Sequence, residues 1–254
     1  MASSFLPQRA DVWRGDALGL APAAALPSGH ALLDAELPGG GWPAAGLTEL
    51  LQPSGVQGAC HDWRLLLPAL ARLATQARGP VALVGGPEGL QPFAPALAAQ
   101  GLPAARLLWV RPADDKALLW ASEQAVRCAD VPAVLAWLPR ARADGLRRLH
   151  LAALDHGKPL FAFRPLAAQA ESSPAPLRLR LESEGEGAMQ VLVFKRRGPP
   201  MGRALALPSE APALAALLAL RRRAHPARPM DMPAAPAETR HELDRHDLDR
   251  SVAA

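Results

Sequence analysis

Short apolar runs alternate with helix-length segments between residues 47 and 164, and this alternation is the feature that most constrains the fold. Apolar runs bounded by glycine or polar residues indicate buried strands, and apolar positions at helical spacing between them indicate amphipathic helices. Such alternation is typical of an α/β fold, a mostly parallel sheet with helices on both faces. The predicted strands are 47–51, 81–85, 106–110, 133–138 and 159–164, and the predicted helices are 62–78, 93–101, 114–129 and 143–157.

The pattern changes after Arg164. Residues 165–176, PLAAQAESSPAP, are typical of a loop. Beyond them, LRLRLESE (177–184) and MQVLVFKRR (189–197) each alternate between apolar and polar residues and are separated by the turn GEGA. Alternation with a period of two predicts an antiparallel hairpin, here extending one edge of the sheet. The segment RALALP (203–208) predicts one more strand.

The two ends of the chain differ from this central domain, which we assign to residues 26–208. Residues 1–25 are predicted to be an N-terminal arm, and residues 26–46 a short helix near 29–36 followed by a glycine-rich turn. Residues 209–254 are predicted to hold a short amphipathic helix at 211–223 and then a disordered tail. The tail is rich in Pro, Ala and charge and has little apolar surface to bury.

Composition excludes several kinds of site. The formal net charge is +4 and the isoelectric point about 9.8, which permits weak DNA contact but does not require it. The two cysteines, Cys60 and Cys128, have no metal-ligand spacing, and His241 and His246 are interpreted as solvated residues, so we expect no metal. Neither a signal peptide nor a long apolar run is present in the sequence, so we expect a cytoplasmic protein without membrane contact.

The segment LLQPSGVQGACHDW (50–63) occupies the place of a phosphate loop, between a predicted strand and a predicted helix. Gly55 and Gly58 are present, but Ala59-Cys60 stand where such a loop needs Lys and Ser or Thr. The later strand AVLAWLPR (133–140) also ends without the carboxylate that would hold a metal. Triphosphate charge would therefore meet no balancing cation. We predict no catalytic, cofactor-binding or metal-binding residues and no ATP hydrolysis, with Glu88 an ordinary loop residue.

The segment LPSGHALLDAELPGGGWPAAGLTELL (26–51) resembles the opening of the core of RecA-type recombinases. In the details of its sequence motifs, the chain is similar to one bacterial family, the translesion DNA synthesis-associated proteins called ImuA. Over about residues 10–207, the motifs that carry this resemblance are VWRGD (12–16), SGHALLDAELPGGGWP (28–43), RLLLPALA (64–71), SPAPLRLRL (173–181) and FKRRGPP (194–200).

The resemblance implies a RecA-like core and an SOS-induced role in mutagenic copying of damaged DNA. The implied partners are an ImuB-type Y-family polymerase-like protein, an error-prone replicative-type DNA polymerase and RecA. Without the groups that handle triphosphate, we interpret the chain as a non-catalytic adaptor. Two alternatives remain open: a SulA-like SOS inhibitor of cell division, and a DNA-dependent ATPase with a non-standard phosphate loop.

Candidate partner-binding residues lie at three places. Trp42 either packs over its own glycine-rich turn or is an exposed anchor. The strand end at Lys195, Arg196 and Arg197 either contacts a partner or DNA phosphate, or is simply solvated. Arg221, Arg222 and Arg223 end the possible docking helix of the tail.

Several other residues are given structural roles. Asp34 and Glu36 are expected to orient the glycine-rich turn, and Arg164 to be a solvated strand end. The loop 165–176 has no basic residue, so recombinase-style DNA binding through it is not expected. Four further tryptophans are expected in the core: Trp63, Trp109, Trp120 and Trp137.

Overall fold

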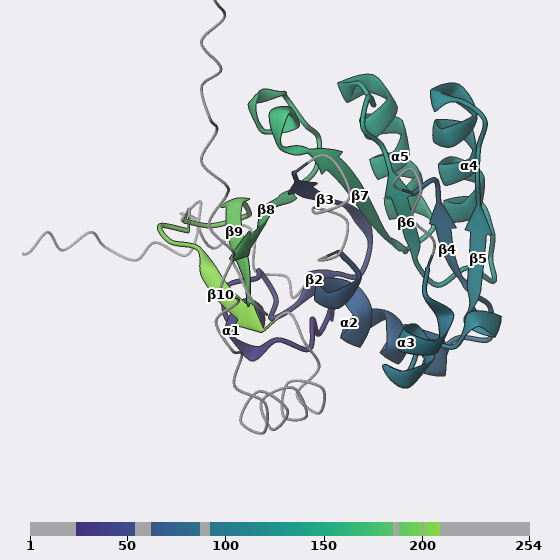
Figure 1. Cartoon of the computed structure of the whole chain (residues 1–254). Coiled ribbons are helices and arrows are strands. Elements are labelled where there is room, and N and C mark those ends of the chain that lie inside the picture. The colour runs from purple at the N-terminus through teal and green to yellow at the C-terminus, as the bar shows by residue number, and fades with distance from the viewer. Residues whose placement is uncertain (1–23, 54–61, 87–91, 185–187, 200, 209–254) are drawn as a thin grey trace, which may run out of the picture. The chain divides into compact units, whose positions relative to one another are not determined.

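An eight-stranded sheet forms the centre of the protein, in a computed structural model that describes residues 24–53, 62–86, 92–184, 188–199 and 201–208 (Figure 1). Its strand order is β10-β9-β8-β3-β7-β6-β4-β5. The strands are β3 (Gly46–Gln52), β4 (Val81–Val84), β5 (Leu107–Val110), β6 (Val134–Trp137), β7 (Pro159–Pro165), β8 (Leu177–Glu184), β9 (Ala188–Lys195) and β10 (Leu205–Pro208).

Most strand pairs are parallel, as the sequence predicts. Strand β3 is parallel to both β7 and β8, and the run from β7 through β6 and β4 to β5 is parallel throughout. Strand β9 is antiparallel to both β8 and β10, so the hairpin extends one edge of the sheet. The predicted α/β fold class, with a mostly parallel sheet and an antiparallel extension at one edge, is confirmed.

Helices cover both faces of the sheet (Figure 1). On one face, α2 (Asp62–Gln76) and α3 (Ala94–Ala99) contribute leucines to a cluster that also contains Phe161 and Phe163. On the other face, α4 (Asp115–Arg127) and α5 (Ala143–Asp155) pack over a second cluster made largely of Ala, Val and Leu. The four strands β3, β4, β6 and β7 are almost wholly buried because both of their faces are covered.

The start of α4 shows how local sequence sets an element boundary. Asp114 is the N-cap, and its Oδ1 accepts a hydrogen bond of 2.7 Å from the backbone N–H of Ala117. Asp115 in the first turn and Arg127 in the last turn complement the helix dipole. The two acids at the beginning of this segment therefore stabilise the first turn of α4.

The chain before β3 adds a two-stranded sheet that the sequence does not reveal. Strands β1 (Ala25–Leu26) and β2 (Trp42–Pro43) pair in antiparallel fashion and enclose the short helix α1 (Ala31–Asp34). Gly29 has a φ of +86°, and a Cβ at this position would overlap the ring of Pro68 in α2. Only glycine therefore satisfies both the backbone conformation and the close packing on α2.

The loop after β7 contains a 3₁₀ segment, η3 (Leu166–Ala170), which lies against both β3 and β7. A second one, η2 (Ala104–Arg106), leads into β5. Within the ranges that the structure describes, no helix is both long and apolar enough to span a bilayer. The predicted arm up to residue 23 and the predicted tail from residue 209 lie outside the described residues.

Candidate functional site

The carboxyl ends of the parallel strands are where α/β proteins commonly bind ligands. Strand β3 ends at Gln52 and helix α2 begins at Asp62, while the loop with Gly55, Gly58 and Cys60 lies outside the described residues, as does Glu88.

At the end of β6, the ring of Trp137 stacks on Phe163 of β7, with ring centroids 4.5 Å apart. The following residue, Leu138, is buried. In a protein that hydrolyses triphosphate, a carboxylate at this strand end would hold the metal. Here the position is occupied by an aromatic pair, which has no ligand atom to offer a hard cation.

Charged side chains cross the other half of the sheet in a row, and the sequence analysis did not single out two of them, Glu49 and Arg178. The strand register places Glu49 of β3 opposite Arg178 of β8, and Arg178 opposite Lys195 of β9. Arg164 of β7 lies opposite Leu51, one pleat along from Glu49. We call Glu49, Arg164 and Arg178, together with the partly buried Lys195, the buried ion row.

Glu49 is the anion at the centre of this row. Its Oε2 accepts from Arg178 Nε at 2.6 Å, and its Oε1 accepts from Ser173 Oγ at 2.6 Å. Arg164 Nη1 lies 3.7 Å from Glu49 Oε1. Glu49, Arg164 and Arg178 are all buried, so each charge has lost its hydration and depends on the others for compensation.

The same cations hold the loop between β7 and β8. Arg178 donates from Nη2 to the carbonyl of Ala168 at 2.7 Å and from Nη1 to that of Glu171 at 3.2 Å. Lys195 donates from Nζ to the carbonyl of Ser173 at 2.7 Å. Arg178 Nη1 also donates to the carbonyl of Gln169 at 3.4 Å. Four carbonyls along this loop are therefore bound to side chains from the sheet, and these bonds hold the loop against the sheet.

Arg164 corrects one expectation from the sequence. It is 2% exposed and not solvated. Its Nη2 donates to the carbonyl of Ala141 at 2.7 Å and to Oε2 of Glu171 at 2.8 Å, which links the loop after β6 to the loop after β7. Arg164 therefore has a structural role, because its guanidinium is bound to acceptors inside the protein.

The three candidate cations after β9 have different surroundings. Lys195 belongs to the buried ion row, and its pKa is lowered by burial and then by the charge of Arg178, while Glu49 opposes the shift. The side chain of Arg196 is 12% exposed and lies 2.8 Å from Oε2 of Glu36, and it also donates to the carbonyl of Pro199. Arg197 is exposed. Of the three, Arg197 has the surroundings that a partner contact requires.

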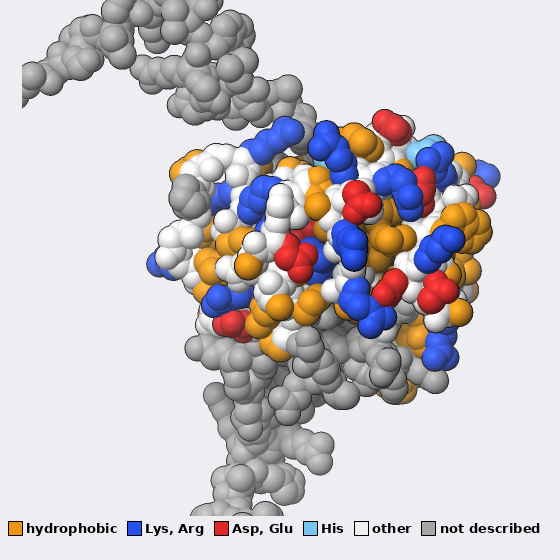
Figure 2. Space-filling model, turned by 90° about the horizontal axis from the view of Figure 1, so that it is seen from above, with side chains coloured by type: hydrophobic (Ala, Val, Ile, Leu, Met, Phe, Trp, Pro, Cys, Tyr) orange, Lys and Arg blue, Asp and Glu red, His pale blue; other side chains and the backbone are white. Residues whose placement is uncertain are grey.

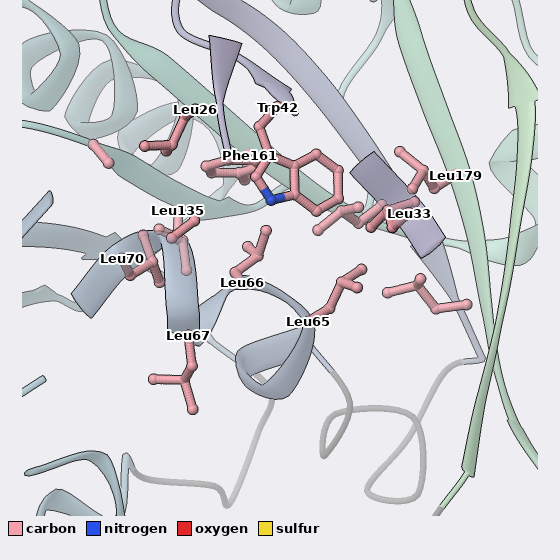
Figure 3. Close-up of a cluster of buried hydrophobic side chains, with 14 of the residues drawn as sticks. Leu26, Leu33, Trp42, Leu65, Leu66, Leu67, Leu70, Leu135, Phe161 and Leu179 are labelled. Carbon is pink, nitrogen blue, oxygen red and sulfur yellow. The ribbon is translucent and has the colours of Figure 1, made fainter. Parts of the chain in front are cut away.

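Trp42 is buried rather than exposed. It is 0% exposed, and its ring meets Phe161 edge to face with centroids 5.6 Å apart, among leucines from α1 and α2 (Figure 3). The hypothesis that Trp42 is an exposed anchor is therefore wrong. Asp34 accepts from the backbone N–H of Ser28 at 2.8 Å, which lies before α1, so the role of Asp34 and Glu36 at the glycine-rich turn stays a prediction. Arg221, Arg222 and Arg223 lie outside the described residues.

The four tryptophans that were expected in the core have different surroundings. Trp109 is partly buried and donates from Nε1 to the carbonyl of Gly85 at 2.7 Å, and Trp137 packs against the first cluster. Trp120 is 62% exposed on α4, so the expectation that it lies in the core is wrong. It belongs to the solvent side of an amphipathic helix, which a count of apolar residues does not reveal. The Trp63 side chain lies outside the part of the chain that the structure describes.

The face of the molecule seen in Figure 2 mixes charges of both signs with apolar side chains between them. Glu123 of α4 pairs with Arg127 at 2.8 Å and with Arg148 of α5 at 2.9 Å.

Among the residues that the structure describes, no group of three or more His, Cys, Asp or Glu side chains could hold a metal ion.

Solved structures are similar to this chain, whereas family models and curated proteins are not. No protein-family model matches the chain, and no curated protein matches it. Among solved structures, SulA from Pseudomonas aeruginosa aligns with a TM-score of 0.37 and 25% sequence identity. That alignment covers 46% of this chain and 97% of the SulA chain.

Proposed function

We propose that this chain is a non-catalytic, RecA-like accessory protein in SOS-induced mutagenic translesion DNA synthesis. It bridges an ImuB-type polymerase-like protein, together with an error-prone replicative-type polymerase, and RecA. The proposal starts from the resemblance carried by SGHALLDAELPGGGWP (28–43) and FKRRGPP (194–200). The fold is an α/β sheet of the kind that this resemblance implies.

One observation carries the non-catalytic part of the proposal. The end of β6, where a metal-binding carboxylate would stand, holds Trp137 stacked on Phe163. The sequence of the first loop also lacks a lysine. A fold without the groups that handle triphosphate is a scaffold, and its activity has to reside in its surfaces.

The fastened loop after β7 supports an adaptor rather than a recombinase-like DNA-binding protein. Residues 165–176 contain no Lys or Arg, and their carbonyls accept hydrogen bonds from Arg178 and Lys195. A loop without cations has nothing with which to neutralise phosphate.

Direct binding with purified components tests the proposal. The tagged full-length chain is mixed in turn with the ImuB-type protein, the error-prone polymerase and RecA, and retention on the resin is measured. We expect retention of the ImuB-type protein and of RecA. Retention of neither would overturn the proposed role.

A matched pair of variants locates the contact. Arg197→Glu changes an exposed cation after β9. Arg72→Glu changes an exposed cation on α2, which covers the face of the sheet opposite to α4 and α5. We expect the first variant to weaken retention of one partner and the second to leave it unchanged. Charge reversal at Arg196 is unsuitable as a test, because it also breaks the pair with Glu36.

Two assays separate the alternatives. Phosphate release from ATP, with and without single-stranded DNA, is expected to stay at the level of the blank; turnover that disappears in Glu88→Ala would establish an ATPase instead. Overexpression is expected to raise the frequency of damage-induced mutation without making the cells filamentous. Filamentation without mutagenesis would favour the inhibitor of cell division.

A further inference from the structure

Helix α5 presents apolar and basic side chains together on its solvent side. Leu151 is 50% exposed and Leu154 is 46% exposed, and Arg147 lies one turn before Leu151. His150 lies between them and is half-buried. We call Arg147, His150, Leu151, Leu154 and Arg197 the α5–β9 patch, and the following observations join Arg197 to it.

His150 and Leu154 are fixed against the start of β3. A Cβ built on Gly46 would lie 3.0 Å from His150 Cε1 and 3.2 Å from Leu154 Cδ2, so both side chains cover this glycine. The backbone N–H of Leu47 donates to His150 Nδ1 at 3.1 Å. Because Nδ1 accepts, the neutral ring carries its proton on Nε2. The imidazole and the leucine are therefore held in place by the sheet.

Arg197 stands near the same end of β3. Strand β9 runs antiparallel to β8 and reaches Lys195 opposite Arg178, so the chain beyond it continues toward the end where β3 begins. The pKa of His150 is lowered by burial first, and then by the positive charges of Arg197 and Lys195. The patch thus combines residues from two elements that lie far apart in the sequence.

Two exposed arginines of the patch, Arg147 and Arg197, are the cations that a partner can reach near the two leucines. Arg148, the next arginine on α5, is paired with Glu123 of α4 at 2.9 Å. Of the acids on α5, Asp144 lies in the first turn, whereas the exposed Asp155 follows Leu154 directly and lies one turn after Leu151. The neutral ring of His150 adds no charge, and Lys195 donates to the carbonyl of Ser173, so the basic border of the patch is formed by Arg147 and Arg197. Two exposed leucines bordered by basic groups match the usual anatomy of a protein interface, an apolar centre with a charged rim.

We propose that the α5–β9 patch docks an acidic amphipathic segment of a protein partner. Leucine or similar side chains of the segment cover Leu151 and Leu154, and its carboxylates face Arg147 and Arg197. The apolar centre favours a peptide over a nucleic acid, because a phosphate backbone gains from the cations but leaves the leucines exposed to water. This inference rests on the proposed adaptor role and names the chemistry of one contact.

The test uses the full-length chain and a fluorescent synthetic peptide of Leu and Glu, patterned as an amphipathic helix. A second peptide has Ser in place of Leu, and a thymidine oligonucleotide serves as a third probe. Binding is measured by fluorescence anisotropy for the unchanged protein, for Arg147→Glu/Arg197→Glu, for Leu151→Ser and for the control Arg72→Glu. All four substituted residues are exposed, and an unchanged unfolding midpoint verifies that each variant is folded.

We expect the double variant to bind the Leu–Glu peptide at least about tenfold more weakly, Leu151→Ser severalfold more weakly, and Arg72→Glu as tightly as the unchanged protein. We also expect the serine peptide to bind at least about tenfold more weakly than the leucine peptide.

Three results would each overturn the inference. These are no binding of the Leu–Glu peptide at about 1 mM, equal binding by the double variant, and equal or tighter binding of the oligonucleotide or the serine peptide. Retention of the purified partners tests the adaptor role separately. The two tests are independent: the protein can retain its partners without binding the peptide, and it can bind the peptide without retaining the partners.

Discussion

Arg178 donates from Nε to Oε2 of Glu49 at 2.6 Å, and both side chains are buried between the sheet and the loop that follows β7. Arg178 is also bound to three loop carbonyls, and Glu49 to Ser173 of the same loop. The pair therefore joins β3, β8 and the loop into one unit, and its energetics depend on every partner being present.

Removing the charge of Glu49 should be strongly destabilising. Glu49→Gln leaves Arg178 and Arg164 buried without their common anion, and we expect a loss of about 3–5 kcal/mol in the free energy of unfolding. The measurement is equilibrium unfolding in urea. The matched control is Glu182→Gln, which removes an exposed partner of Arg180 and should cost about 0–1 kcal/mol. Similar losses in the two variants would contradict a central role for Glu49.

Arg164 should control how tightly the loop after β7 is held. Arg164→Met keeps most of the side-chain volume but removes the bonds to Ala141 and Glu171. We expect amide hydrogen exchange over 166–175 to become about tenfold faster, since each lost bond contributes about 1 kcal/mol. Glu171→Gln, at a mostly exposed carboxylate, should change exchange much less. Unchanged exchange in Arg164→Met would show that Arg178 and Lys195 suffice.

Two tryptophans provide a direct contrast between buried and exposed aromatic residues. Trp42→Ala removes a wholly buried ring that packs on Phe161, and should cost about 3–5 kcal/mol. Trp120→Ala removes a mostly exposed ring from α4, and should change stability by no more than about 0.5 kcal/mol. Thermal or urea unfolding measures both. A large loss in Trp120→Ala would mean that this ring is covered in the folded protein.

Stability should fall as the pH is lowered through the histidine range. Burial lowers the pKa of His150 and of His30 below the ordinary 6.5, so the unfolded chain binds protons that the folded chain does not. The free energy of unfolding is then highest above about pH 6.5, and decreases below it until the folded-state pKa values are passed.

Substitution isolates the contribution of His150. His150→Gln should flatten part of the decrease below about pH 6.5, because the titrating group is gone. His156→Gln, at an exposed position just beyond α5, serves as the control variant. The measurement is urea unfolding at a series of pH values. An identical slope in His150→Gln would assign the pH dependence to other groups.

The elements of this fold were predictable because their signals are local. Runs such as VALV (81–84) and helices such as Asp115–Arg127 are encoded by neighbouring residues, and their boundaries agree with the prediction to within a few positions. The β1–β2 pair was missed because each strand has two residues, too few for any periodicity. The loop after β7 was predicted, but its attachment to the sheet was not.

The candidate site was less predictable, because burial of a polar group depends on contacts between distant parts of the chain. Arg164, Arg178 and Glu49 look in the sequence like ordinary charges on strands. Only the register of β7, β3 and β8 places them in one row beneath a loop. Likewise, adjacent cations such as Arg196 and Arg197 receive different roles only when Glu36, far earlier in the chain, reaches one of them.

The amino-acid sequence by itself determined the fold class, the edge hairpin and the absence of a lysine in the first loop, since each is written in contiguous residues. The tertiary structure alone decided which charges are buried, and that Trp42 is in the core and Trp120 is not. The physical reason is that desolvation and electrostatic pairing are set by what packs against a side chain, and strand order chooses those neighbours.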